Sequence, residues 1–524
     1  MTAGTITPHQ SGQGGRGGFA ALLHAEWTKF RTVRGWVIAM VIAALVTVGF
    51  GLIGQESCGT ANNAACTLPL GPGGEAVADS FYFVRQPLAG NGSITVRMTS
   101  LTGLIPDRAA GSRVPAGSRA NTADMHRGLE PWSDAGIIIE QSTSQGAGYA
   151  AMMVTGTHGV RMQYDYTGDV AGLPGVVSAA SPRWLRLTRS GDTITGYDSA
   201  DGTAWTRVGS ATLPGLPSTV QAGLFAASPQ FTQVTSASLG GSTAVGGPTL
   251  ATGTFDHVGV AGRWTGGWRG TDIGQNAMYP QAPGGFRQAG DRFTVTGSGE
   301  IAPDVPGSGG GVDISQALVG TFAGLIVVVV VGTMFITAEY RRGLIRTTLT
   351  ASPRRGQVVA AKAVVTGLVT FAVGLVAAAV ALPVVERHIR AGGSFIDPVS
   401  MLTQVRLVAG TAALLAVAAV LAVAIGAVLR RSAVAVTVVI VVIMAPYILG
   451  SVLSGGVSQW LLRLTPAAGF AIQQAYPKYP QLGIDYASAS GYYPLAPWAG
   501  FAVLCAWAAA ALVLAIFLVR RRDA

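Results

Sequence analysis

Long apolar segments along this chain are separated by one long polar segment. Six stretches are almost continuous runs of Ala, Val, Leu, Ile and Gly: residues 36–54, 314–336, 363–385, 407–429, 433–453 and 498–519. A helix needs about 20 apolar residues to cross a hydrocarbon layer of about 30 Å, because each residue advances it by about 1.5 Å. The pattern therefore predicts six membrane-spanning helices, five of them within residues 314–519, and a polytopic α-helical membrane protein.

No Asp, Glu, Lys or Arg interrupts any of the six stretches. Charged side chains inside a membrane span are costly, and those that do occur commonly form ion or proton pathways. The sequence therefore shows no intramembrane ion relay, which disfavours an ion-coupled carrier.

A polar, Gly-rich segment separates the first predicted span from the second. Between residues 75 and 300, short alternating or β-branched runs recur between turns marked by Gly and Asp: 81–84, 93–98, 136–140, 160–164, 184–188, 193–197, 205–208, 221–226 and 292–296. Such short strands are typical of an antiparallel sandwich. In the clearest hairpin, Asp201-Gly202 supplies a turn with positive φ, and Trp205 is expected to pack across the strands. The predicted fold class is six transmembrane helices plus an inserted all-β jelly-roll sandwich.

The N-terminal region divides into a tail and a helix. Residues 1–18 are Gly-rich and are expected to be disordered. Within residues 19–35, apolar Phe19, Leu23, Trp27 and Phe30 recur at intervals of three and four, while basic residues take the other faces. This pattern predicts an interfacial amphipathic helix, with a simple membrane-proximal anchor as the alternative. The span that follows lacks the features of a cleavable signal and is interpreted as an uncleaved anchor.

Composition agrees with two different environments for the two kinds of segment. The chain is 49% hydrophobic and 11% charged, against about 25% charged residues in a soluble domain. The net charge of +10 does not indicate nucleic-acid binding, because residues 55–312 hold 15 Arg against 18 Asp and Glu. Only Lys29, Lys362 and Lys478 among the 35 basic residues are lysine, which suggests a bacterial genome of high GC content.

The orientation follows from the basic residues beside the spans, which are retained on the cytoplasmic side. One set of flanks is rich in them: Lys29, Arg31, Arg34, Arg341, Arg342, Arg346, Arg354, Arg355, Lys362, Arg430, Arg431, Arg520, Arg521 and Arg522. The opposite flanks have fewer: Arg387, Arg390, Arg406, Arg463 and Lys478. We therefore expect a multi-pass plasma-membrane protein with both termini in the cytoplasm and residues 55–312 outside it.

Motifs for several enzyme classes are absent. A phosphate-cradling loop needs a Gly-Lys pair, and the sequence has none, so a nucleotide-hydrolysing domain of that class is excluded. Gly12, Gly14 and Gly17 match the spacing of a dinucleotide fingerprint but lack the strand and helix that the motif requires. The six histidines show no paired ligand spacing, and there is no Gly-x-Ser-x-Gly motif. We predict no catalytic residue and no metal site.

Two of the three cysteines follow the first span. Cys58 and Cys66 can close a small disulfide if that side of the membrane is oxidising, and two free thiols are the alternative. Cys505 lies inside the last apolar stretch and is expected to act as a small hydrophobic residue.

A short basic connection, residues 338–360, joins the second and third spans and is divided by Pro353. By charge alone it is an ordinary positive-inside loop. The run Glu339-Tyr-Arg-Arg-Gly-Leu-Ile-Arg346, followed by Ala351-Ser-Pro-Arg-Arg355 and taken with His24-Ala-Glu-Trp-Thr-Lys29, resembles the membrane subunit of a type-2 ABC transporter. Arg463-Leu-Thr-Pro-Ala-Ala-Gly469 also resembles an outer segment of that family.

The resemblance implies a set of partners and a role for the connection. It implies an interfacial elbow helix, export as the direction of transport, a homodimer or paired permease, and a separate ABC ATPase subunit that holds ATP and Mg²⁺; no cofactor is expected in this chain. The long insert departs from the family's usual short first outer loop. The residues to which the resemblance assigns ATPase coupling are Glu339, Tyr340, Arg341, Arg342, Gly343, Leu344, Arg346, Pro353, Arg354 and Arg355.

The insert has a resemblance of its own. The order Trp132…Ala-Gly-Ile-Ile-Ile-Glu140, Trp184-Leu-Arg-Leu-Thr-Arg189 and the turn from Ser199 to Trp205 resembles a concanavalin-like or laminin-G-like jelly roll, and many such domains bind glycans. Trp132, Trp264 and Trp268 are candidates for stacking on cell-envelope sugars, although a sandwich Trp is more often core. Asp134 and Glu140 are considered as an acid–base pair, but no second carboxylate set supports a glycosidase.

Three functions remain open from the sequence. The first is an ABC permease subunit whose outer domain captures cargo or glycan. The second is a membrane-anchored extracytoplasmic glycan-binding or sensor protein. The third, an envelope hydrolase, lacks a recognisable catalytic set.

Overall fold

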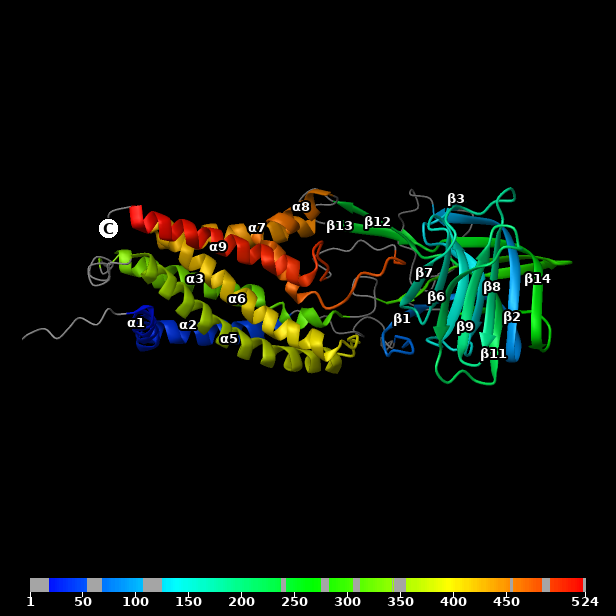
Figure 1. The fold of residues 1–524 in the computed structure, drawn as a ribbon, viewed down its shortest axis with the longest axis horizontal. Helices are drawn as coiled ribbons and strands as arrows, with labels where there is room; N and C mark the ends of the chain where they lie inside the picture. Colours follow the sequence, from blue (N-terminus) through cyan, green and yellow to red (C-terminus); the bar gives the residue numbers. More distant parts are fainter. Residues whose placement is uncertain are drawn as a thin grey trace, which may run out of the picture.

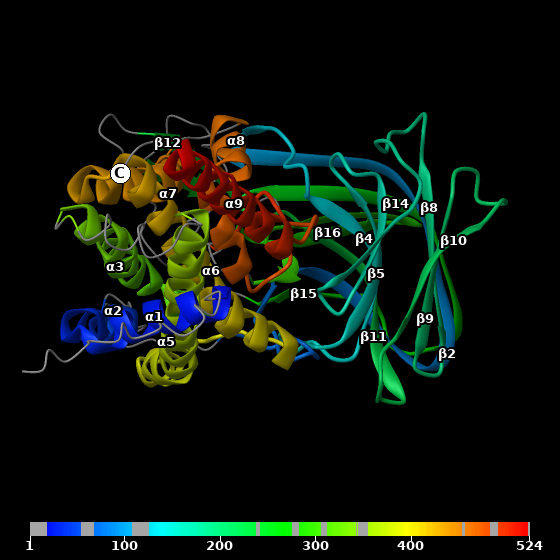
Figure 2. The ribbon, with the colours of Figure 1, turned by 60° about the vertical axis from the view of Figure 1, so that its left-hand side comes forward.

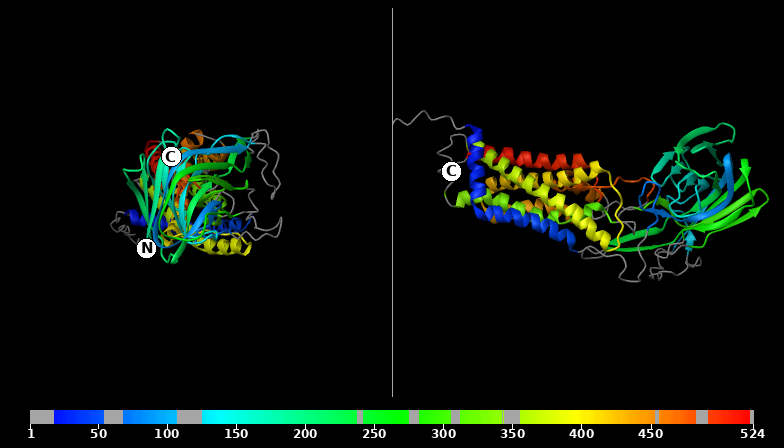
Figure 3. Two further views of the ribbon diagram at one scale, coloured as in Figure 1. Left: turned by 90° about the vertical axis from the view of Figure 1, so that its right-hand side faces the viewer. Right: turned by 90° about the horizontal axis from the view of Figure 1, so that it is seen from below.

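The computed structural model describes residues 18–53, 68–106, 125–236, 242–274, 282–304, 312–341, 343, 355–452, 456–482 and 491–521. The molecule is elongated, with a helical bundle at one end and a β domain at the other (Figure 1). We refer to the end of the bundle farther from the β domain as the loop end. It carries the helix that precedes the first span and the C-terminal end of the last helix (Figures 1 and 3).

Six helices of the bundle are long and apolar enough to cross a membrane, which confirms the predicted number of spans. They are α2 (Arg34–Leu52), α3 (Thr321–Arg341), α5 (Arg355–Ala391), α6 (Met401–Leu429), α7 (Ser432–Val452) and α9 (Pro497–Arg521). Shorter elements are α1 (Phe19–Thr32), η3 (Ile314–Leu318), α8 (Gly456–Leu464) and η4 (Pro466–Gln473). Helix α5 begins at Arg355 rather than at residue 363, so Lys362 lies within a helix and not in a loop.

Helix α6 packs against α3, α5, α7 and α9. Small residues allow these helices to approach closely. A Cβ atom on Gly332 of α3 would lie 2.9 Å from the carbonyl oxygen of Ala419, and one on Gly374 of α5 would lie 3.1 Å from Cα of Ala412. Lipid removes the hydrophobic drive for association between spans, so this close van der Waals packing is a main source of bundle stability.

Within the described residues, the β domain consists of a 14-stranded antiparallel sheet folded into two layers and of two separate strand pairs, the first strand with the last and the twelfth with the thirteenth. Its strands are β1 (Val77–Asp79), β2 (Phe81–Pro106), β3 (Met125–Arg127), β4 (Asp134–Glu140), β5 (Tyr149–Thr155), β6 (Val160–Tyr164), β7 (Gly168–Ala171), β8 (Arg183–Ser190), β9 (Thr193–Ser199), β10 (Thr206–Thr212), β11 (Thr219–Ala227), β12 (Phe231–Ser236), β13 (Ser242–Gly247), β14 (Leu250–Trp264), β15 (Arg269–Ile273), β16 (Gly285–Ala289), β17 (Arg292–Gly297) and β18 (Ile301–Pro303).

The long strand β2 belongs to both layers. Its first part pairs with β11 and β15, and its second part pairs with β8, while β14 runs beside much of its length. Strands β4, β5 and β11 lie nearer the helices, and β8, β9 and β10 lie farther away (Figure 2). Side chains from both layers, such as Leu224 and Leu187, share one buried core. The predicted sandwich is therefore confirmed as a fold class.

Several predicted strands occur as expected, but other strands, including the long strand β14, were not predicted. The runs 81–84 and 93–98 belong to the single strand β2, since β2 bends without a break in the chain. Strand β5 was not predicted, because all seven of its residues are buried and no polar alternation marks it. The predicted hairpin turn is present: Gly202 has φ of +78°, and the Trp205 indole lies 3.8 Å from the Arg186 guanidinium.

The β domain contacts the bundle through the connections between helices. The Ala76 backbone N–H donates to Asp397 Oδ1 at 2.8 Å, in the segment between α5 and α6. Gln481, between η4 and α9, donates from Nε2 to the Tyr166 carbonyl oxygen at 3.1 Å. Ala302 of β18 packs with Leu482 and Tyr492 in a small buried apolar cluster. The two parts are thus joined by side-chain and backbone contacts as well as by the chain itself.

Candidate functional site

Helix α1 runs across the loop end of the bundle and not along the spans (Figure 3). The chain turns at Val33, which is extended between α1 and α2. Phe30 of α1 is buried against Phe335 of α3, with ring centroids 5.4 Å apart. The apolar stripe predicted in this region therefore faces partly into the bundle, which fixes α1 against α3 and α5.

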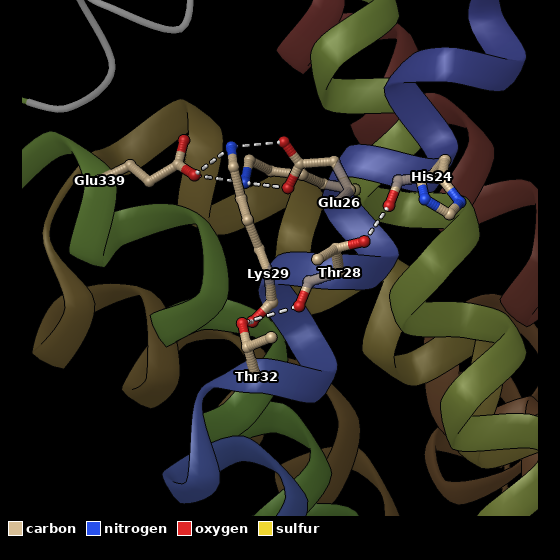
Figure 4. A network of polar contacts seen from close by, with 7 residues as sticks. His24, Glu26, Thr28, Lys29, Thr32 and Glu339 are labelled. Carbon is tan, nitrogen blue, oxygen red and sulfur yellow. Dashed lines mark hydrogen bonds and ion pairs between the residues drawn. The ribbon is translucent and has the colours of Figure 1, made fainter.

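Four charged residues from α1, α3 and α5 meet beneath this helix. Lys362 Nζ lies 2.7 Å from Glu26 Oε2 and 2.7 Å from Glu339 Oε1. Lys29 Nζ lies 2.8 Å from Glu26 Oε1 and 3.2 Å from Glu339 Oε1. Figure 4 shows Glu26, Lys29 and Glu339 pointing toward one another, while the Thr28 and Thr32 hydroxyls bond to carbonyl oxygens of α1 itself. We refer to Glu26, Lys29, Glu339 and Lys362 as the ion cluster.

The ion cluster is buried at its centre and open at one edge. The side chains of Lys362 and Glu26 are 0% and 2% exposed, whereas that of Lys29 is 42% exposed. Two lysines and two glutamates give the cluster no net formal charge, as a buried site requires. The Lys362 ammonium also lies 4.4 Å from the centroid of the Phe335 ring, in a cation–π contact. Burial lowers the pKa of Lys29, but its bonds to Glu26 and the charges of Glu26 and Glu339 raise it above its ordinary value.

The ion cluster brackets the connection between α3 and α5. Glu339 lies in the last turn of α3, and Lys362 lies in the second turn of α5. Gly343, just past the end of α3, has φ of +68°, a left-handed conformation that favours glycine and commonly ends helices. Both ends of the connection are therefore tied to each other and to α1, over a sequence separation of 336 residues between Glu26 and Lys362.

A second contact joins this site to another connection at the loop end. The Arg430 guanidinium lies 5.1 Å from the centroid of the Tyr340 ring. Arg430 ends α6 in a left-handed conformation, with φ of +57°. Glu339 Oε2 is buried and has no hydrogen-bond partner among the described residues, so it can accept one more bond. The base of the α3–α5 connection thus contacts both α1 and the α6–α7 connection.

The residues predicted to couple to an ATPase fall partly within the described chain. Glu339, Tyr340 and Arg341 are in the last turn of α3, Gly343 follows it, and Arg355 begins α5. Arg342, Leu344, Arg346, Pro353 and Arg354 lie outside the described residues, as do Cys58 and Cys66. Cys505 is a free thiol in α9.

Sequence reasoning did not identify Glu26 and Lys362 as members of a site. In the sequence, Lys362 is only one of the basic residues beside the third predicted span, and Glu26 is only part of the His24–Lys29 motif. Two features of the sequence point to these residues. Glu26 is the single acidic residue of α1, and Lys362 is one of the three lysines of the chain. No sequence pattern pairs residues so far apart.

The three candidate sugar-stacking tryptophans do not form one surface. Trp264 and Trp268 lie with ring centroids 6.3 Å apart and pack, half-buried, against the sandwich core. Trp132 is 8% exposed and stacks on His158 at 3.9 Å between ring centroids. Trp132 precedes β4, whose first residue pairs with Ala227 at one end of β11. Trp264 pairs with Leu88, and Leu88 pairs with Val220 near the opposite end of β11. Glycan stacking by any of them remains a prediction.

Asp134 and Glu140 occupy the two ends of β4. Six residues along a strand correspond to about 20 Å, well beyond the roughly 5–9.5 Å that separates the carboxyl groups of glycosidases. Asp134 and Glu140 are therefore too far apart to act as the acid–base pair of a glycosidase. Among the described residues no group of three or more His, Cys, Asp or Glu could hold a metal ion.

The fold and the site together define a multi-pass membrane protein whose helical bundle supports a loop-end ion cluster and carries a separate β domain. Residues 135–524 match the model of a family described as ABC-2 family transporter protein, and the chain belongs to this family. The match includes most of the β domain and every span except the first. Proteins of this family are membrane components of ABC transporters. No curated protein matches the chain.

Two solved structures are similar to parts of the chain. A structure of scytalido-glutamic peptidase with a transition state analog inhibitor shares 9% identity, covers 42% of this chain and 98% of its own, and has a TM-score of 0.25. A functionally unknown protein from Saccharomyces cerevisiae shares 16% identity, covers 35% of this chain and 76% of its own, and has a TM-score of 0.20. At these scores neither likeness bears on function.

Proposed function

We propose that this chain is the permease subunit of an ABC exporter and that a separate ATPase subunit drives it by docking on residues 342–354. The observation that supports this most directly is the ion cluster, which fastens both ends of that connection to α1. In this proposal the partner holds ATP and Mg²⁺, since the chain has no Gly-Lys pair for a phosphate-binding loop. In this proposal the ion cluster is the mechanical link between the docked partner and the bundle.

The ion cluster makes the loop end respond as one body. A push on the connection reaches α3 through Glu339 and α5 through Lys362, and both residues bond to each other. Glu26 passes the same displacement to α1, which continues into α2. ATPase closure therefore shifts the population between two arrangements of the bundle, rather than bending one helix alone.

The remaining parts of the proposal concern placement and partners. The loop end faces the cytoplasm, in agreement with its basic flanks, and the β domain lies outside the membrane. Two permease chains pair around the transport pathway, as a homodimer or with a related chain. The β domain captures cargo or envelope glycan, and the adjacent Trp264 and Trp268 are the residues of first choice for a sugar contact.

Co-purification of the tagged full-length chain from its native membrane tests the proposal. We expect a stoichiometric ATPase subunit to accompany it, with hydrolysis activity that depends on the permease. Recovery of the chain alone, with no hydrolysis, would contradict the proposal and favour a membrane-anchored glycan-binding protein.

The docking assignment predicts the result of a double substitution. Leu344→Asp with Arg346→Glu places negative charge in the proposed interface, and we expect the ATPase subunit to bind at least about tenfold more weakly, since one lost interface anchor costs about 1.4 kcal/mol or more. The measurement is the ratio of ATPase to permease recovered in a salt-controlled pull-down. Arg431→Glu, an exposed charge reversal in the neighbouring α6–α7 connection, serves as the matched control. Equal recovery for the double variant and the wild type would remove residues 342–354 from the interface.

A further inference from the structure

An open apolar groove lies between α1 and α5. Its volume is about 670 Å³. Helix α1 contributes Leu23, His24 and Trp27, and the α5 wall consists of Val365, Leu368, Val369, Ala372 and Val373. Only His24 among these side chains is polar. The groove is therefore formed by one turn of α1 and by about two turns of a membrane span.

The position of the groove along α5 places it in the hydrocarbon layer. Its α5 wall begins three residues after Lys362, which lies at the loop end, and continues to Val373. At about 1.5 Å per residue, this wall covers roughly 4 to 16 Å from the ion cluster, about half of a 30 Å hydrocarbon layer. Leu368 is 65% exposed and Trp27 is 44% exposed, so the groove opens sideways to the surrounding lipid.

An exposed basic side chain lies near the groove. Arg31 lies one helical turn after Trp27, on the same side of α1, and is exposed. Glu26, the single acidic residue of α1, is buried and bonded to Lys362 and Lys29. The accessible charge of α1 is therefore positive throughout, which complements a negatively charged headgroup.

We propose that the groove between α1 and α5 binds an acyl chain of an anionic phospholipid, whose headgroup phosphate is held by Arg31. The proposal depends on the position of α5 in the membrane and not on the docking of an ATPase. It goes beyond transport itself, because the same turn of α1 that lines the groove with Leu23 and Trp27 places Glu26 in the ion cluster. A bound lipid therefore holds α1 in the position in which Glu26 meets Lys362.

Trp27 provides a direct probe of occupancy. The full-length chain is reconstituted in nanodiscs of phosphatidylcholine that contain equal fractions of dibrominated phosphatidylglycerol or dibrominated phosphatidylcholine. The Trp27 signal is the difference between the wild type and Trp27→Phe, which separates it from the other nine tryptophans. We expect brominated phosphatidylglycerol to quench Trp27 with about fivefold higher apparent affinity, because one basic residue near an anionic lipid contributes about that factor.

Three variants distinguish a built site from the lipid that surrounds any span. Arg31→Gln should abolish the headgroup preference while leaving quenching by both lipids, and Ala372→Phe, at an exposed position of the groove wall, should reduce quenching by both. Arg463→Gln, on α8 at the end of the bundle nearer the β domain, is the matched control and should change neither.

Equal quenching by the two lipids in the wild type would overturn the proposal. Absence of quenching, with Leu368→Cys forming a disulfide between two copies, would assign the groove to a permease–permease interface instead.

Discussion

Replacing Lys362 with methionine is expected to lower the free energy of unfolding by about 3–5 kcal/mol, because it removes the buried ammonium and leaves Glu26 and Glu339 with only the partly exposed Lys29. Glu26 Oε2 bonds to Lys362, and the Glu26 side chain is 2% exposed, so water cannot replace the lost ammonium. Methionine keeps most of the side-chain volume and its contact with the Phe335 ring, so the loss is electrostatic rather than a packing defect. Thermal unfolding of the purified full-length chain, followed by tryptophan fluorescence, measures the effect.

Lys29→Met is the matched control for this prediction. Lys29 bonds to the same two glutamates, but its side chain is 42% exposed. A partly exposed ion pair contributes about 0–1 kcal/mol. In Lys29→Met the buried Glu26 also keeps its bond to Lys362. Equal destabilisation by Lys29→Met and Lys362→Met would show that burial does not set the strength of the ion cluster.

A compensating variant separates stability from coupling. Adding Glu26→Gln to Lys362→Met removes the uncompensated charge, so the double variant should recover much of the lost stability. The ionic link between α1 and α5 is absent in the double variant. We therefore expect it to fold while its partner's ATPase activity responds less to the permease, and a full response would mean that the ion cluster has only a structural role.

The number of spans could be predicted because each membrane span can be recognised from its own stretch of sequence. Each of the six has a run of apolar residues whose length is set by the bilayer, and no long-range information is needed to find it. The limits of α5 were less visible, since Lys362 and Glu386 look like flanks although both lie inside the helix. The bonds that hold Lys362 in place come from α1 and α3, so they cannot be read from its own neighbourhood.

In the β domain, too, some features can be recognised from a few neighbouring residues, whereas others depend on distant segments of the chain. The turn at Gly202 was predictable, because an Asp-Gly pair favours a positive φ at glycine wherever it occurs. Strand β5 was missed because it is buried on both faces, between the sandwich core and the layer of β1 and β18. Glu140 of β4 is buried in the same region, next to Asp79 of β1 and Tyr149 of β5. These three residues come from separate strands, so no short segment of sequence reveals the environment of Glu140.

Carboxyl groups on this buried face of the β domain predict an unusual pH dependence. Burial raises the pKa of Asp79 to about 6 and that of Glu300 to about 7. Glu140 is 1% exposed, and burial, with the nearby charge of Asp79, raises its pKa to about 9 against the opposing effect of Arg85. In each case the native protein holds a proton that the unfolded chain, with a carboxyl pKa near 4, has already released.

The sign of the effect follows from proton linkage. Between about pH 4.5 and pH 9 the native state binds more protons at Glu140 than the unfolded state does, so the free energy of unfolding decreases as the pH rises. One such group contributes a slope of up to about 1.4 kcal/mol per pH unit. The contribution is thus fully present below about pH 4.5 and is lost progressively at higher pH, and Asp79 and Glu300 add to it up to about pH 6 and pH 7.

Glu140→Gln is therefore expected to stabilise the β domain by about 2–3 kcal/mol at pH 7 and to have almost no effect at pH 4.5, because glutamine is neutral in both the folded and the unfolded state. The measurement is the free energy of unfolding of the full-length chain at pH 4.5, 5.5, 7 and 8, followed by tryptophan fluorescence. Asp291→Asn, in the exposed turn between β16 and β17, is the control and should leave the pH dependence unchanged. A stability curve for Glu140→Gln that runs parallel to that of the wild type would mean that Glu140 is ionised in the native protein, since only a carboxyl that holds its proton on folding gives curves that diverge as the pH rises.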